Sequence, residues 1–415
     1  MRTGKIYKAL ILVMIMALTL SGCTTFDSFR HTFFEKTDKD DHVIHIGVYE
    51  PETGSNSESG LNETKGIELA NSIYNSVDGY RVDLVKVDTQ SSTTAAENAV
   101  QGLIKMKPVA IIGSAGEAAS LVASKYVDKA KIPAITPSAI NPLITQNCHY
   151  YFRASLTNAQ MGAGAADYAC AHLESTHVGI VVPKNDTTST ALVDGFKDKV
   201  TEILGKDNDV IDLNTEIEVD EKQFSDVAKK IKKENIDTLY IPFGTEAMDQ
   251  FFKVMEKNGL TRLTYIGTKD WGNDDFIEMM SNHPAIKTAF PYLSVVDTEN
   301  MHAEDMTKEA ERFRIEYSNK YGAEDIPTDG AALGYDAYLL VINAIHQAKT
   351  LKGSDIRKAL LSLKDVRCAT GIFNFDNNGN TVREVNIATI RDGEIVSLHT
   401  TGDTTEAEEI GGLKK

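Results

Sequence analysis

The chain has 415 residues, of which 42% are hydrophobic and 25% charged, and its formal net charge at pH 7 is −17. So acidic a chain argues against nucleic acid as a partner and favours a soluble, self-repelling surface. The length is sufficient for two lobes of ordinary domain size.

The first residues read as an export signal. Arg2, Lys5 and Lys8 come without any acid, and an apolar run from residue 9 to residue 20 follows. As a helix this run spans about 18 Å, too short for a hydrocarbon core of about 30 Å, so a signal is expected rather than a spanning helix. Residues 1–22 carry a charge of +3, so their removal leaves −20.

The signal ends in Leu20-Ser21-Gly22-Cys23, which resembles the bacterial lipobox. That resemblance implies that a diacylglyceryl group is attached to the Cys23 thiol. The alternative is an ordinary cleaved signal followed by a chance cysteine. Residues 23–41 are polar and mixed in charge, as in a tether, and residues 401–415 form an acidic tail that we expect to be flexible.

Strand and helix patterns alternate from residue 42 onward. In the first series we expect strands at residues 42–49, 80–87, 109–112 and 133–136, with helices around residues 67–74, around 96–104 and at 118–130. Short apolar strands separated by helices indicate a parallel sheet that is covered on both faces.

The same alternation restarts after residue 158. We expect strands at residues 177–182, 210–217, 238–241 and 264–266, with helices at 159–173, 190–204, 224–234, 247–258 and 275–280. Further helices are expected at 303–321, 331–348 and 354–362, and strands at 372–375, 385–390 and 394–398. Two such series predict an α/β fold with two doubly wound parallel-sheet lobes.

No enzyme signature is present: the sequence contains no GxSxG, HExxH, P-loop or GxGxxG motif. We therefore expect no enzymatic activity, no cofactor and no metal. Cys148, Cys170 and Cys368 have no metal-like spacing; either one pair forms a disulfide after export or all three are buried thiols. Two doubly wound lobes instead predict a cleft for a small molecule at the carboxyl ends of the strands.

Several segments, taken together in their order, resemble the type I periplasmic binding proteins, specifically the branched-chain amino acid (Leu/Ile/Val) binding proteins of ABC transporters. The resemblance extends from about His42 to about His399. It is carried by Ile46-Gly47-Val48 with Pro51 and Thr53-Gly54, Ile111-Ile112-Gly113-Ser114, Ile132 to Ala139 with Asn141-Pro142, Phe152-Arg153 with Gly162, Gly334-Tyr335-Asp336-Ala337, and Thr370-Gly371 with Phe373, Phe375-Asp376 and Gly379.

The resemblance implies that the chain crosses between the lobes through a hinge. Lobe one would comprise residues 42–156 and 291–366, and lobe two residues 157–290 and 367–400. It also implies a ligand site in the cleft, formed by Ser59, Gly116, Glu117, Ser138, Ala139, Ile140, Asn158, Thr187, Gly244, Lys269, Asp270 and Trp271.

These positions depart from the family pattern, in which lobe-one hydroxyls meet the ligand carboxylate and a lobe-two acid meets its ammonium group. Glu117 and Ile140 stand where hydroxyls are expected, Lys269 stands where the acid is expected unless the register shifts to Asp270, and Thr187 and Gly244 replace aromatic residues. An ordinary α-amino acid in the usual orientation is therefore not expected.

Two residues of this set, Glu117 and Trp271, have more than one interpretation. Glu117 either pairs with Lys269 across the cleft, reads a ligand of opposite charge arrangement, or begins a helix in solvent. Trp271, the one tryptophan, either packs over the ligand or belongs to the core of lobe two.

The resemblance implies a solute-binding lipoprotein of an ABC importer, anchored outside the cytoplasmic membrane of a bacterium. Its partners would be a small polar metabolite such as an amino acid, an ABC permease and, through the lipid, the membrane. The alternative is a ligand sensor or a regulator of an envelope enzyme that keeps the fold with a changed pocket. An exported hydrolase rests on fold analogy alone.

Overall fold

The computed structural model describes residues 42–146, 148–184, 186, 188–205, 211–293 and 307–399. The predicted signal, tether and tail lie outside these residues, and so do Cys23 and Thr187. Throughout the described part, no helix is both long enough and apolar enough to cross a membrane.

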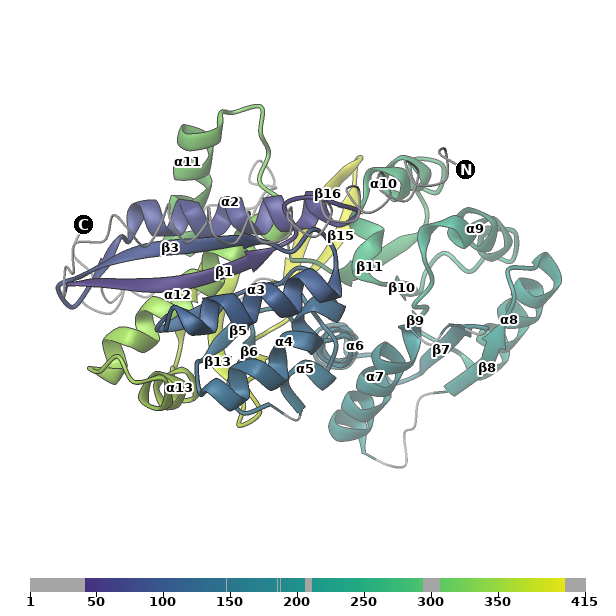
Figure 1. Ribbon diagram of the computed structural model, residues 1–415. Helices are drawn as coiled ribbons and strands as arrows, with labels where there is room; N and C mark the ends of the chain where they lie inside the picture. Colours follow the sequence, from purple (N-terminus) through teal and green to yellow (C-terminus); the bar gives the residue numbers. More distant parts are fainter. Residues whose placement is uncertain are drawn as a thin grey trace, which may run out of the picture. The chain divides into compact units, whose positions relative to one another are not determined.

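The first sheet has six strands in the order β2-β3-β1-β4-β5-β6 (Figure 1). Strands β1, β4, β5 and β6 pair in parallel. Its strands are β1 (Val43–Glu50), β2 (Ser76–Val77), β3 (Tyr80–Asp88), β4 (Ala110–Ile112), β5 (Ala134–Thr136) and β6 (Tyr151–Arg153). The associated helices are α2 (Ser57–Ile73), α3 (Thr93–Lys105), α4 (Glu117–Ala130), α5 (Leu143–Gln146), α11 (Lys308–Tyr321), α12 (Asp329–Ala348) and α13 (Gly353–Ser362).

The second sheet has seven strands in the order β16-β15-β11-β10-β9-β7-β8, parallel from β8 to β11. Its strands are β7 (Val178–Pro183), β8 (Ile211–Ile217), β9 (Thr238–Tyr240), β10 (Thr264–Ile266), β11 (Lys287–Pro291), β15 (Ile387–Arg391) and β16 (Glu394–His399). The helices are α6 (Asn158–Asp167), extended by a π-helical turn at Tyr168–His172, α7 (Thr188–Leu204), α8 (Glu221–Glu234), α9 (Met248–Lys257) and α10 (Asp274–Met280). Short 3₁₀ turns occur at Thr245–Ala247 and Lys269–Gly272.

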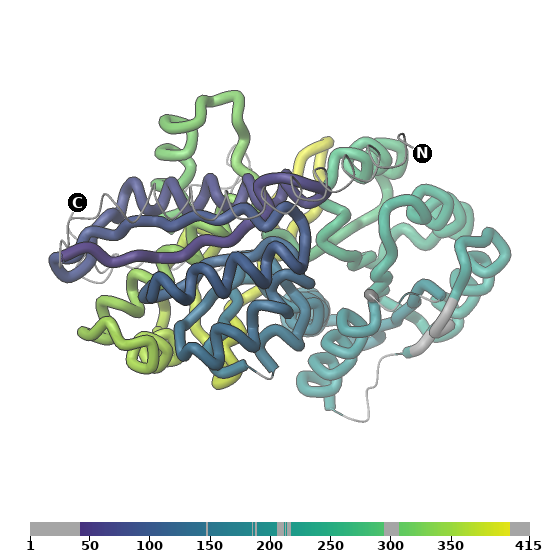
Figure 2. The backbone as a smooth tube through the Cα atoms, in the orientation of Figure 1, coloured from purple at the N-terminus to yellow at the C-terminus, as the bar shows by residue number. Residues whose placement is uncertain are grey.

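The chain passes between the two sheets more than once (Figure 2). It leaves the first sheet after β6, returns after β11 to form helices α11 to α13, and reaches the second sheet again at β15. A small three-stranded sheet precedes that last passage: β12 (Val366–Cys368), β13 (Gly371–Phe375) and β14 (Thr381–Val382). Cys368 and Phe373 of this sheet are buried with the core of the first sheet. The exact lobe boundaries stay a prediction.

Helices α2 and α12 approach each other so closely that glycine is required at the crossing. A Cβ atom on Gly66 would lie 1.8 Å from the carbonyl oxygen of Ala331, and one on Gly334 would lie 2.3 Å from that of Glu63. Neither distance is compatible with a side chain. The crossing therefore fixes the start of α12 beside the first turns of α2.

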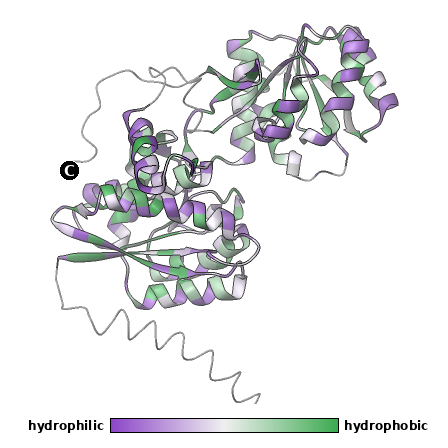
Figure 3. Ribbon diagram, turned by 90° about the horizontal axis from the view of Figure 1, so that it is seen from above, coloured by the Kyte–Doolittle hydropathy of each residue, from purple (hydrophilic) through white to green (hydrophobic). Residues whose placement is uncertain are grey.

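The predicted alternation is confirmed: each strand and helix expected between residues 42 and 293 is present, and most ends differ by a few residues. The exception is α2, which begins at Ser57, well before the expected stripe at Ile67, because its first turns are polar and carry no apolar periodicity. The strands are largely apolar in Figure 3, and β4 and β5 are completely buried, as expected for a sheet covered on both faces. The short strands β6 and β11 were not predicted from their pattern. Each is only a few residues long and follows a turn, so it carries little periodic signal.

Candidate functional site

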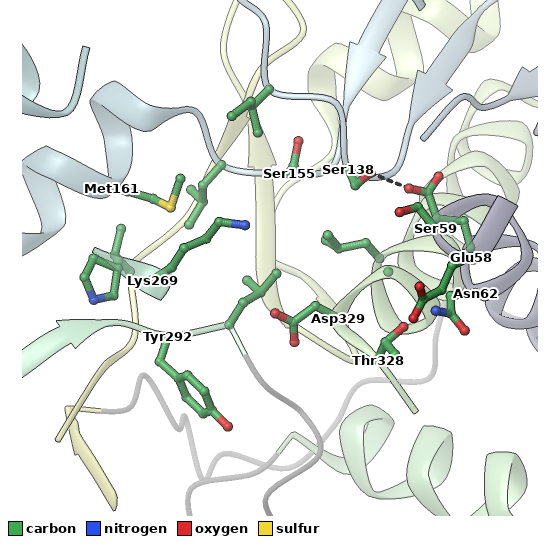
Figure 4. A pocket seen from close by; sticks show the side chains of 18 residues that line it. Glu58, Ser59, Asn62, Ser138, Ser155, Met161, Lys269, Tyr292, Thr328 and Asp329 are labelled. Carbon is green, nitrogen blue, oxygen red and sulfur yellow. Dashed lines mark hydrogen bonds between the residues drawn. The ribbon is translucent and has the colours of Figure 1, made fainter. Parts of the chain in front are cut away.

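A pocket of about 450 Å³ lies where loops from both sheets come together (Figure 4). Ser138 and Ile140 follow β5, Ser155 and Leu156 follow β6, and Lys269 follows β10. The pocket also takes the end of β11 with residues 291–293, and the first turns of α2 and α12. The carboxyl ends of parallel strands thus supply much of its wall, which is the usual ligand position in open α/β sheets.

The charged side chains of the pocket lie on opposite sides. Lys269 extends toward the central space from one side, and Asp329 and Glu58 lie on the other (Figure 4). Glu63 also belongs to the wall. Among the described lining residues, Lys269 is the one cation, and three residues carry carboxyl groups.

Ser138 and Glu63 are joined by a hydrogen bond in which the Ser138 hydroxyl donates to Glu63 Oε1, drawn as the dashed line in Figure 4. Glu63 is 1% exposed, and its charge acts on a second buried carboxyl, Glu50. Burial raises the pKa of Glu63 to about 7. Burial, and next the charge of Glu63, raise the pKa of Glu50 well above its ordinary value. The pair therefore retains a proton that an exposed pair would lose.

Asp329 is exposed to water and lines the pocket. It is the first residue of α12 and directly follows the N-cap residue Thr328. Desolvation by the surrounding protein raises the pKa of its carboxyl, and the positive charges of Lys269 and Arg383 oppose that rise. The position is favourable for a carboxylate in one further respect, because the first turn of a helix carries partial positive charge.

The sequence of residues 43–394 matches the periplasmic binding protein family. The chain belongs to this family. The matched residues include strands of both sheets and the pocket lining. The match confirms the expected resemblance and the α/β fold. It also confirms the expectation that the chain is not an enzyme, because the family and its structural neighbours are solute-binding proteins.

Three known proteins illustrate the relationship. An amino acid binding protein of Pseudomonas aeruginosa is 27% identical over 221 residues, which are 52% of this chain and 58% of that protein. The match thus covers little more than half of that curated relative. A leucine binding protein from Thermotoga maritima is 27% identical, with a TM-score of 0.60 over 86% of this chain and 98% of the other. A solute binding protein from R. palustris in complex with benzoate is 22% identical, with a TM-score of 0.57 over 89% and 99%.

Four of the predicted ligand residues of this periplasmic binding protein line the pocket, namely Ser59, Ser138, Ile140 and Lys269. Others do not appear in the described wall: Gly116, Glu117, Ala139, Asn158, Gly244 and Asp270. Glu117 is the exposed first residue of α4, in agreement with the solvent alternative. Thr187 and Cys23 lie outside the described residues.

Trp271 belongs to the core around the second sheet. Its side chain is completely buried, stacks on Phe276 at 4.7 Å between ring centroids, and donates from Nε1 to the carbonyl oxygen of Phe243 at 2.9 Å. These contacts agree with the packing interpretation and leave no face of the indole for a ligand.

Most of the acidic wall was not predicted from the sequence. Glu58 and Glu63 are on α2, a helix that was expected only from the apolar stripe that begins at Ile67. Thr328 and Asp329 could have been recognised as a helix start, because Thr328 caps α12 by accepting from the backbone N–H of Ala331. No local signal places Glu63 in a pocket.

Within the described residues, no group of three or more His, Cys, Asp or Glu side chains is arranged to hold a metal ion. The described cysteines Cys148, Cys170 and Cys368 are free and buried. Burial raises the pKa of the Cys148 and Cys170 thiols to about 11, which disfavours the reactive thiolate.

Proposed function

We propose that this protein is the solute-binding lipoprotein of an ABC importer. It captures a small polar metabolite, an amino acid or a related compound, in the pocket described above. The lobes, residues 42–156 with 291–366 and residues 157–290 with 367–400, close around the ligand by a hinge movement. A permease in the cytoplasmic membrane then receives the ligand. Cys23 carries the lipid, and residues 24–41 tether the lobes to the membrane.

One observation carries this proposal: the pocket wall combines side chains that follow strands of both sheets. Ser138 follows β5 of the first sheet, and Lys269 follows β10 of the second. A ligand that touches both residues links the two sheets, so its binding energy favours the closed arrangement. The wall combines many polar side chains with apolar ones such as Leu156, Met161 and Leu333, a mixture that suits a small polar molecule.

Thermal unfolding of the purified protein tests the binding role. The panel contains amino acids, amides, small peptides and aromatic acids. A ligand at one hundred times its dissociation constant stabilises the folded state by about 2.7 kcal/mol. If no compound raises the melting temperature, the proposed transport role is contradicted. The alternative, a protein that keeps this fold but regulates an envelope enzyme, is then favoured. Genes for a permease and for ATPases beside this gene are a second, independent expectation.

The lipid anchor is tested by Cys23→Ala. We expect the wild-type chain to fractionate with membranes and to incorporate a radioactive fatty acid, and the variant to do neither. Cys170→Ala is the matched control because this buried thiol lies far from the signal in sequence, and it is expected to remain membrane-bound. A Cys23→Ala chain that still carries fatty acid would contradict the assignment.

A further inference from the structure

Two serine hydroxyls in the pocket already donate hydrogen bonds to other groups of the protein. Ser138 donates to Glu63 Oε1, and Ser155 donates to the carbonyl oxygen of Ala139 at 3.0 Å. A hydroxyl has one proton but two lone pairs. Both serines therefore present hydrogen-bond acceptors, not donors, to a ligand.

The carboxylates beside them add acceptors of the same kind. Glu58 and Asp329 are exposed into the pocket, and neither makes a hydrogen bond or a salt bridge to another described residue. Of the side chains here, Ser138 and Asp329 would offer a ligand carboxylate only an acceptor and a like charge, which is unfavourable in a partly desolvated cavity. This wall suits a group rich in N–H donors and positive charge.

Lys269 offers the opposite chemistry. Its ammonium group has three donors and no acceptor. It reaches the same space from the other side of the pocket (Figure 4), and no carboxylate of the described residues lies within salt-bridge distance of it. The wall thus has two exposed carboxyl groups, on Glu58 and Asp329, for one lysine, even when Glu50 and Glu63 are left out.

We propose that the pocket binds a basic amino acid, with its cationic nitrogens on Ser138, Glu58 and Asp329 and its carboxylate on Lys269. The inference rests on the proposed function and specifies its ligand class. The orientation is opposite to the one implied by the family resemblance, in which lobe one meets the carboxylate. Its rival is an anion such as benzoate, held by the first turns of α2 and α12.

Calorimetric titration of the full-length chain with five probes separates these possibilities: arginine, citrulline, agmatine, leucine and benzoate. Citrulline matches arginine in size but lacks the guanidinium charge, and agmatine lacks the carboxylate. We expect arginine to bind most tightly, and citrulline and agmatine each to bind at least about tenfold more weakly, since each leaves one charged group of the pocket unpaired.

Variants assign the two ends of the ligand. Asp329→Asn and Glu58→Gln should weaken arginine by about tenfold and change citrulline little. Lys269→Ala should weaken arginine and leave agmatine unchanged, which removes the difference between the two probes. Asp270→Asn removes a neighbouring exposed carboxylate outside the described pocket wall and is expected to behave as the wild type.

Each contrary result has a definite meaning. If leucine, citrulline or benzoate binds as tightly as arginine, the charge preference is overturned while solute binding stands. If Lys269→Ala weakens arginine and agmatine equally, the orientation is overturned. If none of the five probes binds, the ligand class is rejected, and the wider thermal panel decides separately whether the chain binds a solute at all.

Discussion

Glu50 and Glu63 are two buried carboxyls, each 1% exposed, whose charges act on each other, and Glu63 belongs to the pocket wall. Glu50 Oε2 accepts from the backbone N–H of Ala115 at 2.7 Å, and Glu63 Oε1 accepts from Ser138. Glu50 Oε1 and Glu63 Oε2 have no hydrogen-bond partner among the described residues. A proton retained on either carboxyl lessens their repulsion, and their bonds to Ala115 and Ser138 connect β1 and α2 to the loops after β4 and β5.

The pair predicts that stability falls as the pH rises. The pKa of Glu63 is raised from 4.5 to about 7, so between these values the folded chain binds more protons than the unfolded chain. Unfolding is therefore favoured as the pH increases from about 5 to about 8, by at most about 3 kcal/mol. Melting curves across this range should show the decrease.

Glu63→Gln tests the origin of that pH dependence. The variant cannot ionise at this position, so its melting temperature should vary less between pH 5 and pH 8 than that of the wild type. Glu324→Gln, at an exposed position outside the pocket wall, serves as the control and should keep the wild-type dependence. An unchanged slope in Glu63→Gln would show that other groups determine it.

Trp271→Phe is expected to lower stability without lowering ligand affinity. The indole is completely buried and stacks on Phe276, so its replacement leaves a cavity, and Trp271→Ala should cost about 3–5 kcal/mol. Chemical denaturation measures the loss, and titration with a ligand found in the thermal panel measures affinity. If Trp271→Phe has wild-type stability but weaker binding, the packing interpretation is wrong and Trp271 contacts the ligand.

Gly66→Ala should be strongly destabilising, because the added methyl group would lie 1.8 Å from the carbonyl oxygen of Ala331. Helices α2 and α12 must then separate, at a cost of about 1–3 kcal/mol or more. Gly330→Ala is the matched control on α12, since its Cβ would have only ordinary contacts of 3.6 Å or longer. Equal stability of the two variants in urea denaturation would argue against the close crossing.

Asp336→Asn should weaken the junction between α12 and the small third sheet. The buried Asp336 carboxylate accepts from the backbone N–H groups of Ala369 and Thr370, at 2.7 and 2.9 Å, and attracts Arg383. Loss of this charge leaves a largely hidden guanidinium group uncompensated, at a cost of about 3–5 kcal/mol.

Asp392→Asn, in the exposed turn between β15 and β16, is the control for this charge removal and should have little effect on stability. A second variant, Asp336→Asn combined with Arg383→Leu, should recover part of the loss because it also removes the buried cation. If the double variant is no more stable than Asp336→Asn, the charge of Arg383 is not the cause.

The fold could be predicted because its signals are local. The apolar stripe from Ala96 to Ile104 and the buried run from Val109 to Ile112 each reflect neighbouring residues on one face of a helix or strand, and both elements are present. Local periodicity is weak in strands of three residues such as β6, which was missed. The Leu-Ser-Gly-Cys segment likewise depends only on adjacent residues, and its lipid stays a prediction.

The sequence alone therefore determined the alternating α/β architecture, the family and the general position of a site at the ends of the strands. Only the tertiary structure decided which polar groups line the pocket and which protons they have left to offer. Ser138 and Glu63 are 75 residues apart, and their hydrogen bond exists only because α2 is packed beside the loop after β5. Whether a serine presents a donor or an acceptor to the pocket depends on such distant partners, and no local pattern records them.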